Sequence, residues 1–296
     1  MNDAARFRVA GLIAKPDADR VGETLLELQR FLALRGVAVV AEATTAMLVP
    51  DTFGAGIPLE ELGRNVDFAV VVGGDGTILG AARALAPFDI PLLGVNLGRL
   101  GFLADISPTQ LVTRLDEVLD GRCTEERRFL LTATVIRRGE RIYEQTAVND
   151  VVVHRTNATS MVEMVTHVDG VFLNSQRSDG LIVSTPTGST AYALSVGGPI
   201  LSPSLKALVL APINPHALTM RPIVVDSESV VGISFRAGRN FGAKVICDSV
   251  TSPDLDVDDC IEIRQSGRSF KLLHPEDYDF FEILRAKLNW STGHPG

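Results

Sequence analysis

Residues 67–85 read Asp67-Phe68-Ala69-Val70-Val71-Val72, then Gly73-Gly74-Asp75-Gly76-Thr77, then Ile78-Leu79-Gly80-Ala81-Ala82-Arg83-Ala84-Leu85. The apolar run before the glycines predicts a buried strand, and the run after them predicts a helix. A glycine-rich turn between a strand and a helix N-terminus is a usual place to hold phosphate. A turn that only bound phosphate would gain nothing from a carboxylate, so Asp75 indicates chemistry, as a general base or a metal-linked group. The alternative is that Asp75 only caps the helix.

Strand and helix patterns alternate around this turn. Apolar runs predict strands at residues 7–14, 37–40, 67–72 and 91–96, a helix stopped by Gly36 follows the first of them, and residues 51–62 look irregular. This alternation predicts a parallel sheet covered on both faces, an α/β fold. Ligands on such sheets bind at the carboxyl ends of the strands, where the glycine turn and the loop at residues 96–102 both fall.

The pattern changes after residue 107. Ser107, Pro108 and Gln110 predict a helix that starts with a capping box and ends near Gly121. Short β-rich runs follow up to residue 273, and Asp169-Gly170 predicts a hairpin between two of them.

We therefore expect a two-domain chain. The boundaries are an α/β nucleotide domain at 1–110, a β-rich, β-sandwich-like domain at 111–274, and a C-terminal segment with a helix at 275–296.

Composition limits the possible partners. The chain has 296 residues, 46% of them hydrophobic and 22% charged, and a net charge of -8. That is enough for two domains with substantial cores, and the acidic balance argues against a nucleic-acid or anionic-membrane surface. The three cysteines form no CxxC pair and show no metal-ligand spacing, which indicates reduced thiols. Residues 1–6 carry no leader pattern and no run approaches ~20 apolar residues, so we expect a cytoplasmic protein without a membrane span.

Two further clusters carry polar groups suited to a nucleotide. Asn149 and Asp150 begin an apolar strand, where an amide beside a carboxylate could hydrogen-bond a ribose diol; the alternative is a simple turn. The second cluster is dense in hydroxyls and glycines and follows Arg177, which could pair with Asp179 or with a phosphate. It reads Ser178-Asp179-Gly180-Leu181-Ile182-Val183-Ser184-Thr185-Pro186-Thr187-Gly188-Ser189-Thr190-Ala191-Tyr192-Ala193-Leu194-Ser195-Val196-Gly197-Gly198-Pro199.

In this second cluster a strand enters a Thr-Gly-Ser-Thr turn, and a helix is expected near Ala191. Its hydroxyls and amides could bind a nucleotide, and the alternative is a capped surface turn. His154 and His216 have no carboxylate or metal partner in sequence, so we assign both to structure.

In this order and at these spacings, the three clusters resemble the NAD kinase family. The resemblance covers nearly the whole chain: residues 73–77, 96–102, 148–150 and 176–199, and then Arg221-Pro222 and Cys247-Asp248-Ser249. The Gly-Gly-Asp-Gly turn alone is shared with phosphofructokinases and with diacylglycerol and sphingosine kinases. The run at residues 178–199 is far more particular to NAD kinases.

The resemblance implies an α/β nucleotide domain followed by a β-rich domain, with the end of the chain returning to the first. It implies transfer of the γ-phosphoryl group of ATP to the 2′-hydroxyl of the adenosine ribose of NAD, giving NADP. Asp75 would accept the hydroxyl proton. The implied binding residues are Gly74, Gly76, Thr77 and Phe102 near phosphates and NAD, Asn149 and Asp150 at a ribose, Arg177 near phosphate, and Asp179, Thr190, Ala191, Tyr192, Ala193, Leu194 and Ser195.

The implied partners are NAD and ATP, with a divalent cation, Mg²⁺, accompanying ATP and no metal ligands assigned to the protein. A homodimer or homotetramer built through the β-rich domain is also implied. Some relatives carry histidine where Ser160 stands and glutamine where Val250 stands, and contacts at these positions are left open.

Two other functions share parts of the pattern. A lipid kinase with the same glycine turn would need an apolar or basic membrane-facing surface, which this acidic chain does not suggest. A non-catalytic nucleotide sensor should lack the base, yet Asp75 is present. The sequence leaves open the use of polyphosphate in place of ATP and the choice between NAD and NADH.

Overall fold

The computed structural model describes residues 7–16, 20–98, 101–157, 160–236 and 241–290. It divides into two compact units, unit 1 (Met1–Arg127 and Ser269–Gly296) and unit 2 (Arg128–Arg268). Two long strands, β5 (Cys123–Arg137) and β16 (Cys260–Pro275), each pass from one unit into the other. The expected helix after residue 107 therefore lies in unit 1.

Unit 1 is built on a parallel sheet, as the alternating pattern predicts. Its strands lie in the order β2-β1-β3-β4-β16, and each neighbouring pair in that order is parallel. Beyond β16 the sheet continues with antiparallel strands of unit 2, so the sheet as a whole is mixed. The elements of unit 1 are β1 (Val9–Ala14), α1 (Val21–Leu34), β2 (Ala38–Ala41), α2 (Ala43–Ala46), α3 (Pro50–Phe53), α4 (Leu59–Asn65), β3 (Phe68–Val72), α5 (Asp75–Leu85), β4 (Pro91–Val95), α6 (Leu111–Leu119) and α8 (Phe280–Leu288).

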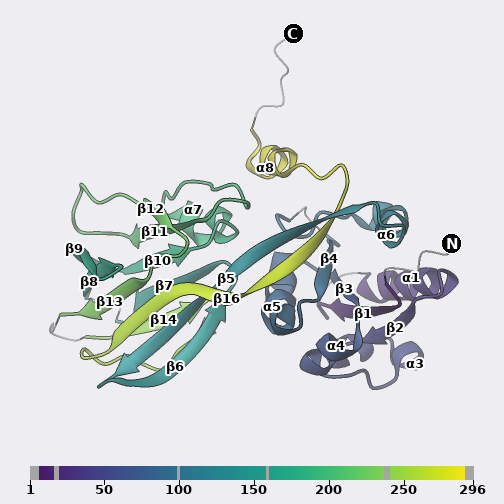
Figure 1. Cartoon of the computed structure of the whole chain (residues 1–296), viewed down its shortest axis with the longest axis horizontal. Coiled ribbons are helices and arrows are strands. Elements are labelled where there is room, and N and C mark those ends of the chain that lie inside the picture. Colours follow the sequence, from purple (N-terminus) through teal and green to yellow (C-terminus); the bar gives the residue numbers. More distant parts are fainter. Residues whose placement is uncertain (1–6, 17–19, 99–100, 158–159, 237–240, 291–296) are drawn as a thin grey trace, which may run out of the picture. The chain divides into compact units, whose positions relative to one another are not determined.

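Helices cover both faces of the sheet of unit 1 (Figure 1). On one face, apolar residues of α1 and α6 share a buried core with residues of β1, β3 and β4. On the other face, α4 and α5 come close to the strands: a Cβ on Gly11 would meet Leu62 at 3.1 Å, and one on Gly94 would meet Ile78 at 2.6 Å. Strands buried on both faces have to be continuously apolar, which explains the runs that the sequence shows.

Two local expectations were wrong. Residues 51–62 are not irregular, because α3 starts at Pro50 and α4 follows Pro58. These helices are short, and α4 buries one large side chain, Leu62, so no helical period is visible in the sequence. The capping box is also absent. Ser107 Oγ lies 3.2 Å from Gln110 Oε1 and caps no helix amide, because a 3₁₀ turn at Pro108–Gln110 precedes α6.

Unit 2 contains two antiparallel arrays. One holds β16-β13-β8-β9 with β5 and β6, and the other is a separate sheet ordered β12-β11-β10-β7-β14-β15. The further elements of unit 2 are β6 (Glu140–Ala147), β7 (Asp150–Arg155), β8 (Val162–Val168), β9 (Val171–Ser178), β10 (Gly180–Ser184), α7 (Tyr192–Ser195), β11 (Ala207–Ile213), β12 (Ile223–Asp226), β13 (Val231–Phe235), β14 (Ala243–Cys247) and β15 (Val250–Thr251).

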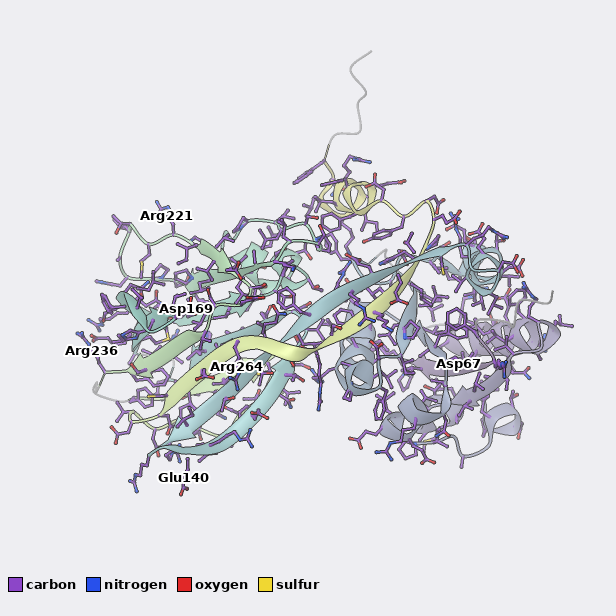
Figure 2. All side chains as sticks on the ribbon, viewed as in Figure 1. Asp67, Glu140, Asp169, Arg221, Arg236 and Arg264 are labelled. Carbon is purple, nitrogen blue, oxygen red and sulfur yellow. The ribbon has the colours of Figure 1, made fainter. Side chains whose placement is uncertain are left out.

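The two arrays of unit 2 share one apolar core. It combines buried residues of β5, β8, β13 and β16 with buried residues of β7, β10, β11 and β14. This confirms the β-sandwich-like prediction. The expected hairpin is also present: Asp169, labelled in Figure 2, and Gly170 join β8 to β9 with φ of 52° and 78°. Positive φ at both central residues is what a tight hairpin turn requires.

Among the described residues, no helix combines the length and the apolar character needed to cross a membrane. Cys123, Cys247 and Cys260 form no disulfide with one another.

Candidate active site

The glycine turn of unit 1 is tightly held at its start and open at its end. Gly73 donates its amide to the carbonyl of Val95 at 2.8 Å, and a Cβ on Gly73 would meet Thr77 Oγ1 at 2.5 Å. By contrast, apart from atoms of its chain neighbours and of the α5 backbone, a Cβ placed on Gly74 or Gly76 would meet no described atom within 4 Å, and both residues are exposed. An anion can therefore approach the backbone of Gly74 and Gly76 closely.

Asp75 is the first residue of α5, and its carboxylate binds a distant loop. Oδ2 accepts the amide of Phe102 at 2.9 Å, and Oδ1 accepts those of Leu103 at 3.0 Å and Ala104 at 3.3 Å. The N-cap residue is Gly74, and no side chain caps α5. The reading of Asp75 as a helix cap is therefore wrong. Its carboxylate organises the loop that we name the amide loop, residues 101–105.

The hydrogen bonds leave one acceptor position on the Asp75 carboxylate. Oδ1 already accepts two amides, whereas among the described residues Oδ2 accepts only that of Phe102. A carboxylate oxygen can accept about two hydrogen bonds, so Oδ2 retains capacity for a hydroxyl proton. The N-terminus of α5 favours the negative charge.

Gly101 makes the contact between Asp75 and the amide loop possible. A Cβ on Gly101 would collide with Asp75 Oδ1. The next residue, Phe102, is half-buried and has the Lys287 ammonium 5.5 Å from its ring centroid. Arg99 and Leu100, which belong to the sequence-predicted loop at residues 96–102, lie outside the described residues.

In unit 2, Asn149 and Asp150 stand at the start of β7 and are fixed from two sides. The Asp248 carboxylate accepts the amides of Val148 at 3.0 Å and Asn149 at 2.9 Å, and the Asp248 amide donates to the Asp150 carbonyl at 3.0 Å. On the other side, Thr185 Oγ1 donates to the carbonyl of Val148 at 2.7 Å. The pair is therefore an anchored strand start and not a free turn.

Asp150 is 5% exposed. Burial, with a smaller contribution from the negative charge of Asp248, raises the pKa of Asp150 to about 7. Its carboxyl group therefore changes protonation state close to neutral pH.

The hydroxyl-rich run lies against this strand start. A Cβ on Gly188 would collide with the carbonyl of Asn149, so only glycine lets the two backbones pack this closely. A 3₁₀ turn at Gly188–Thr190 leads into α7, a single four-residue turn and not a longer helix. Thr190 and Leu194 are half-buried, as is Ala191, whereas Tyr192 and Ser195 are exposed and Ala193 is buried. The structure therefore places Gly188, the first residue of this turn, directly against Asn149.

Asp179 and Arg177 lie elsewhere in unit 2. Asp179 precedes β10, whose other end, Ser184, pairs with Asp150. Five residues of extended strand put these ends about 17 Å apart. Asn214 Nδ2 donates to Asp179 Oδ2 at 3.0 Å and Arg155 Nε to Oδ1 at 2.5 Å.

The Asn214 bond, aided by Arg155 and opposed by burial, holds the pKa of Asp179 below its usual value. Arg177 is exposed on β9, and the Asp179 carboxylate is paired with Arg155 instead. Of the two alternatives for Arg177, the pairing with Asp179 is therefore not observed.

The described residues contain no group of three or more His, Cys, Asp or Glu side chains placed to hold a metal ion. A Mg²⁺ ion commonly uses one or two carboxylates together with substrate phosphates and water.

Several residues of these sites have roles that the sequence did not predict. They are Gly101 and the amides after it, Asp248 and Thr185 at the strand start, and Arg155 and Asn214 at Asp179. Asp248 stands in the quoted Cys-Asp-Ser motif, which was the available signal. The donors to Asp75 are backbone amides 27 or more positions away, for which residue type gives no signal.

Known families account for this arrangement. Family models described as the ATP-NAD kinase N-terminal and C-terminal domains match residues 10–123 and 148–275. The chain belongs to the NAD kinase family. An NAD kinase of Methylococcus capsulatus is 56% identical over 288 residues, which cover 97% of this chain and 99% of the relative. One of Hahella chejuensis is 46% identical, with 97% of each chain covered.

Solved structures agree in fold. An NAD kinase from Archaeoglobus fulgidus in complex with ATP has a TM-score of 0.73 at 29% identity and covers 94% of this chain and 99% of its own. Yeast NADH kinase complexed with NADH has a TM-score of 0.87 at 24% identity and covers 99% and 94%. These similarities confirm the family resemblance and support neither the lipid kinase nor the nucleotide sensor.

Proposed function

We propose that this chain transfers the γ-phosphoryl group of ATP to the 2′-hydroxyl of the adenosine ribose of NAD, with Asp75 accepting the hydroxyl proton. Membership in the NAD kinase family supports the reaction. The observation that carries the residue assignment is the Asp75 carboxylate itself, oriented by three amides and left with acceptor capacity on Oδ2.

The step is balanced by one proton transfer and one phosphoryl transfer. The 2′-hydroxyl gives its proton to Asp75 Oδ2 while its oxygen bonds to the γ-phosphorus, and the bond from that phosphorus to the bridging oxygen breaks to release ADP. Phosphoryl transfer depends mainly on in-line positioning and charge neutralisation. The amide loop supplies the positioning of the base. A divalent cation, Mg²⁺, bound with ATP would neutralise phosphate charge.

We assign the binding roles residue by residue. Gly74, Gly76 and Thr77 approach phosphates, for which the open space at both glycines is the support, and Phe102 contacts NAD. In unit 2, Asn149 and Asp150 bind ribose hydroxyls, and residues 190–195, which follow Gly188, bind NAD. Asp179 and Arg177 would bind at the other end of β10, where Asp179 is held ready by Arg155 and Asn214.

We also propose a cytoplasmic homodimer or homotetramer assembled through unit 2, with no nucleic-acid or membrane partner. β9 lies at the end of its sheet, and Val171, Phe172 and Leu173 on it are 71%, 59% and 37% exposed. An exposed edge strand with apolar side chains is suited to pairing with another chain. Cysteines that form no disulfide agree with a reducing compartment.

The test is NADP formation by the purified protein with NAD, ATP and Mg²⁺, set beside Asp75→Asn and the exposed control Asp51→Asn. A general base contributes ~10²- to 10⁴-fold to the rate, so turnover by Asp75→Asn should fall by that factor. The control Asp51→Asn should keep the wild-type turnover. Wild-type turnover by Asp75→Asn would remove Asp75 from the base role. Absence of NADP from the wild type with both ATP and polyphosphate would contradict the reaction.

A further inference from the structure

His274 lies near the end of β16, in unit 1, and is enclosed by ionisable groups. Its Nδ1 is 2.8 Å from Asp105 Oδ2, and its Nε2 is 3.1 Å from Glu126 Oε2. The ring stacks on Tyr278 with centroids 3.8 Å apart and an interplanar angle of 17°. The His274 side chain is 2% exposed and that of Asp105 7%.

These contacts determine how many protons the cluster carries. An ionised carboxylate only accepts hydrogen bonds, and a neutral imidazole donates from only one nitrogen. Hydrogen bonds to both Asp105 and Glu126 therefore need one proton beyond a neutral ring and two carboxylates. Loss of that proton breaks one of the two bonds.

The cluster joins directly onto the amide loop. Asp105 follows Leu103 and Ala104, whose amides bind Asp75 Oδ1, and Ile106 after it donates to the carbonyl of Gly94 at 3.3 Å. Asp105 thus ties the loop to the C-terminal part of the chain. Lys287 of α8 reaches the same loop at the Phe102 ring, 5.5 Å from the centroid.

We propose that His274 is a positioning residue for phosphoryl transfer, which acts through Asp105 to hold the amide loop and thereby the carboxylate of Asp75. This inference rests on the proposed function for Asp75. His274 touches neither reacting group, and its effect passes through the backbone of residues 102–105.

The surroundings allow the cluster to exchange its proton. A cavity of about 360 Å³ adjoins Asp105 and Tyr278. Its other ionisable lining groups are Arg114, Asp277, Asp279 and Glu282. Arg114 is paired with Asp277 at 2.6 Å and with Glu117 at 3.0 Å.

The test compares two substitutions of the same histidine. In His274→Asn the side-chain amide nitrogen falls near the Nδ1 position and can still donate to Asp105. In His274→Gln it falls near Nε2 and can reach only Glu126. His167→Gln, in unit 2 on β8, is the matched control. Two sets of quantities are measured: hydrogen exchange of the backbone amides of residues 101–106, and kcat and KM for NAD.

We expect His274→Gln to raise exchange at Phe102, Leu103 and Ala104 and to lower kcat roughly 10- to 100-fold, because a catalytic group displaced by about 1 Å costs this much. KM for NAD should rise less than kcat falls, since Asn149 and Asp150 in unit 2 are unaffected and only Phe102 lies on the loosened loop. His274→Asn should keep most of the wild-type exchange protection and most of the wild-type kcat. The control should match the wild type.

Each outcome separates the inference from the proposed function. A wild type that makes no NADP contradicts the function, while exchange at residues 101–106 still decides whether His274 holds the loop. Unchanged exchange and kcat in His274→Gln overturn the inference, as do equal losses in His274→Asn and His274→Gln. If His274→Gln fails to fold, Asp105→Ala removes the same contact from the other side and must show the same exchange and kcat changes.

Discussion

The carboxylate of Asp248 accepts a hydrogen bond from the amide of Asn149 at 2.9 Å and so fixes the start of the strand that carries Asp150. The second carboxylate oxygen accepts the amide of Val148, which makes Asp248 a two-point clamp. Asp248 has φ of 52°, a left-handed conformation that Asp and Asn tolerate better than most residues. Asp248 is therefore a structural support for the proposed ribose-binding pair.

Asp248→Asn should weaken this clamp without straining the backbone. The amide group replaces one acceptor oxygen with a donor that faces a backbone N–H, and an unsatisfied pair of this kind costs about 1–3 kcal/mol. We expect a fall of that size in the free energy of unfolding, measured in urea, and a higher KM for NAD. Asp254→Asn, at an 80% exposed side chain, is the matched control and should change neither.

Asp150 gives stability a pH dependence of definite sign. Burial and Asp248 raise its pKa in the folded state to about 7, against about 3.9 in the unfolded chain. Between these values the folded state binds the proton and the unfolded state does not. The free energy of unfolding must therefore fall as pH rises from about 4 to 7, by an amount on the order of a few kcal/mol. In Asp150→Asn this part of the slope should vanish, whereas an unchanged slope would show that Asp150 does not titrate there.

Substitution of Gly101, which lies against the Asp75 carboxylate, should lower activity with little effect on stability. A Cβ on Gly101 would collide with Asp75 Oδ1, the movable end of a side chain, so Gly101→Ala should displace the carboxylate at little cost to folding. We expect kcat for NADP formation to fall about 10- to 100-fold with a nearly unchanged melting temperature. A large loss of stability with normal kcat in the remaining folded protein would contradict this reading.

Gly80→Ala is the control for Gly101→Ala. Gly80 lies within α5, and a Cβ there would meet no described atom within 4 Å other than those of its chain neighbours and of the helix backbone. Alanine there should raise the free energy of unfolding by about 0.5–1 kcal/mol, because it is the better helix former, and should leave kcat unchanged.

The main elements of unit 1 are predictable because their sequence signals are local. β3 and β4 are continuous apolar runs, and the glycines after β3 mark the turn into α5. α4 is not predictable in this way, since only Leu62 among its large side chains is buried and its position depends on the sheet beneath it. The capping box predicted at Ser107 does not form, because Pro108–Gln110 adopt a 3₁₀ turn.

Candidate site residues are recognisable by type, but their partners are not. Asp75 stands out because an acid in a phosphate-binding turn is unusual, yet its three donors are backbone amides that any residue would supply. Asp150 and Asp179 belong to two clusters that both suggested nucleotide binding, and the five residues of β10 nevertheless put them at opposite strand ends. His274 carries no motif at all, and only the pairing of β16 with β4 brings it to Asp105.

The ion pair of Arg137 and Asp259 predicts an unequal response to removing its two partners. Arg137 Nε donates to Asp259 Oδ1 at 2.7 Å and Nη2 to Oδ2 at 2.8 Å, and the Asp259 side chain is fully buried whereas that of Arg137 is 33% exposed. Arg137→Ala leaves a buried charge without its counter-ion and should cost about 3–5 kcal/mol. Asp259→Ala leaves a guanidinium that water can reach and should cost less.

The pH dependence of that loss provides the check. The hydrogen bonds from Arg137 hold the pKa of Asp259 below its usual value against the effect of burial. This contribution to stability is fully present above the unfolded pKa of about 4 and is lost as pH falls through the lower folded value. Urea unfolding at pH 7 and at pH 4 should therefore show a smaller difference between wild type and Arg137→Ala at pH 4, where the variant can protonate Asp259. Arg141→Ala, at a 63% exposed side chain, should change stability by less than about 0.5 kcal/mol at either pH. A loss in Arg137→Ala that is the same at both pH values would show that the charge of Asp259 is not its cause.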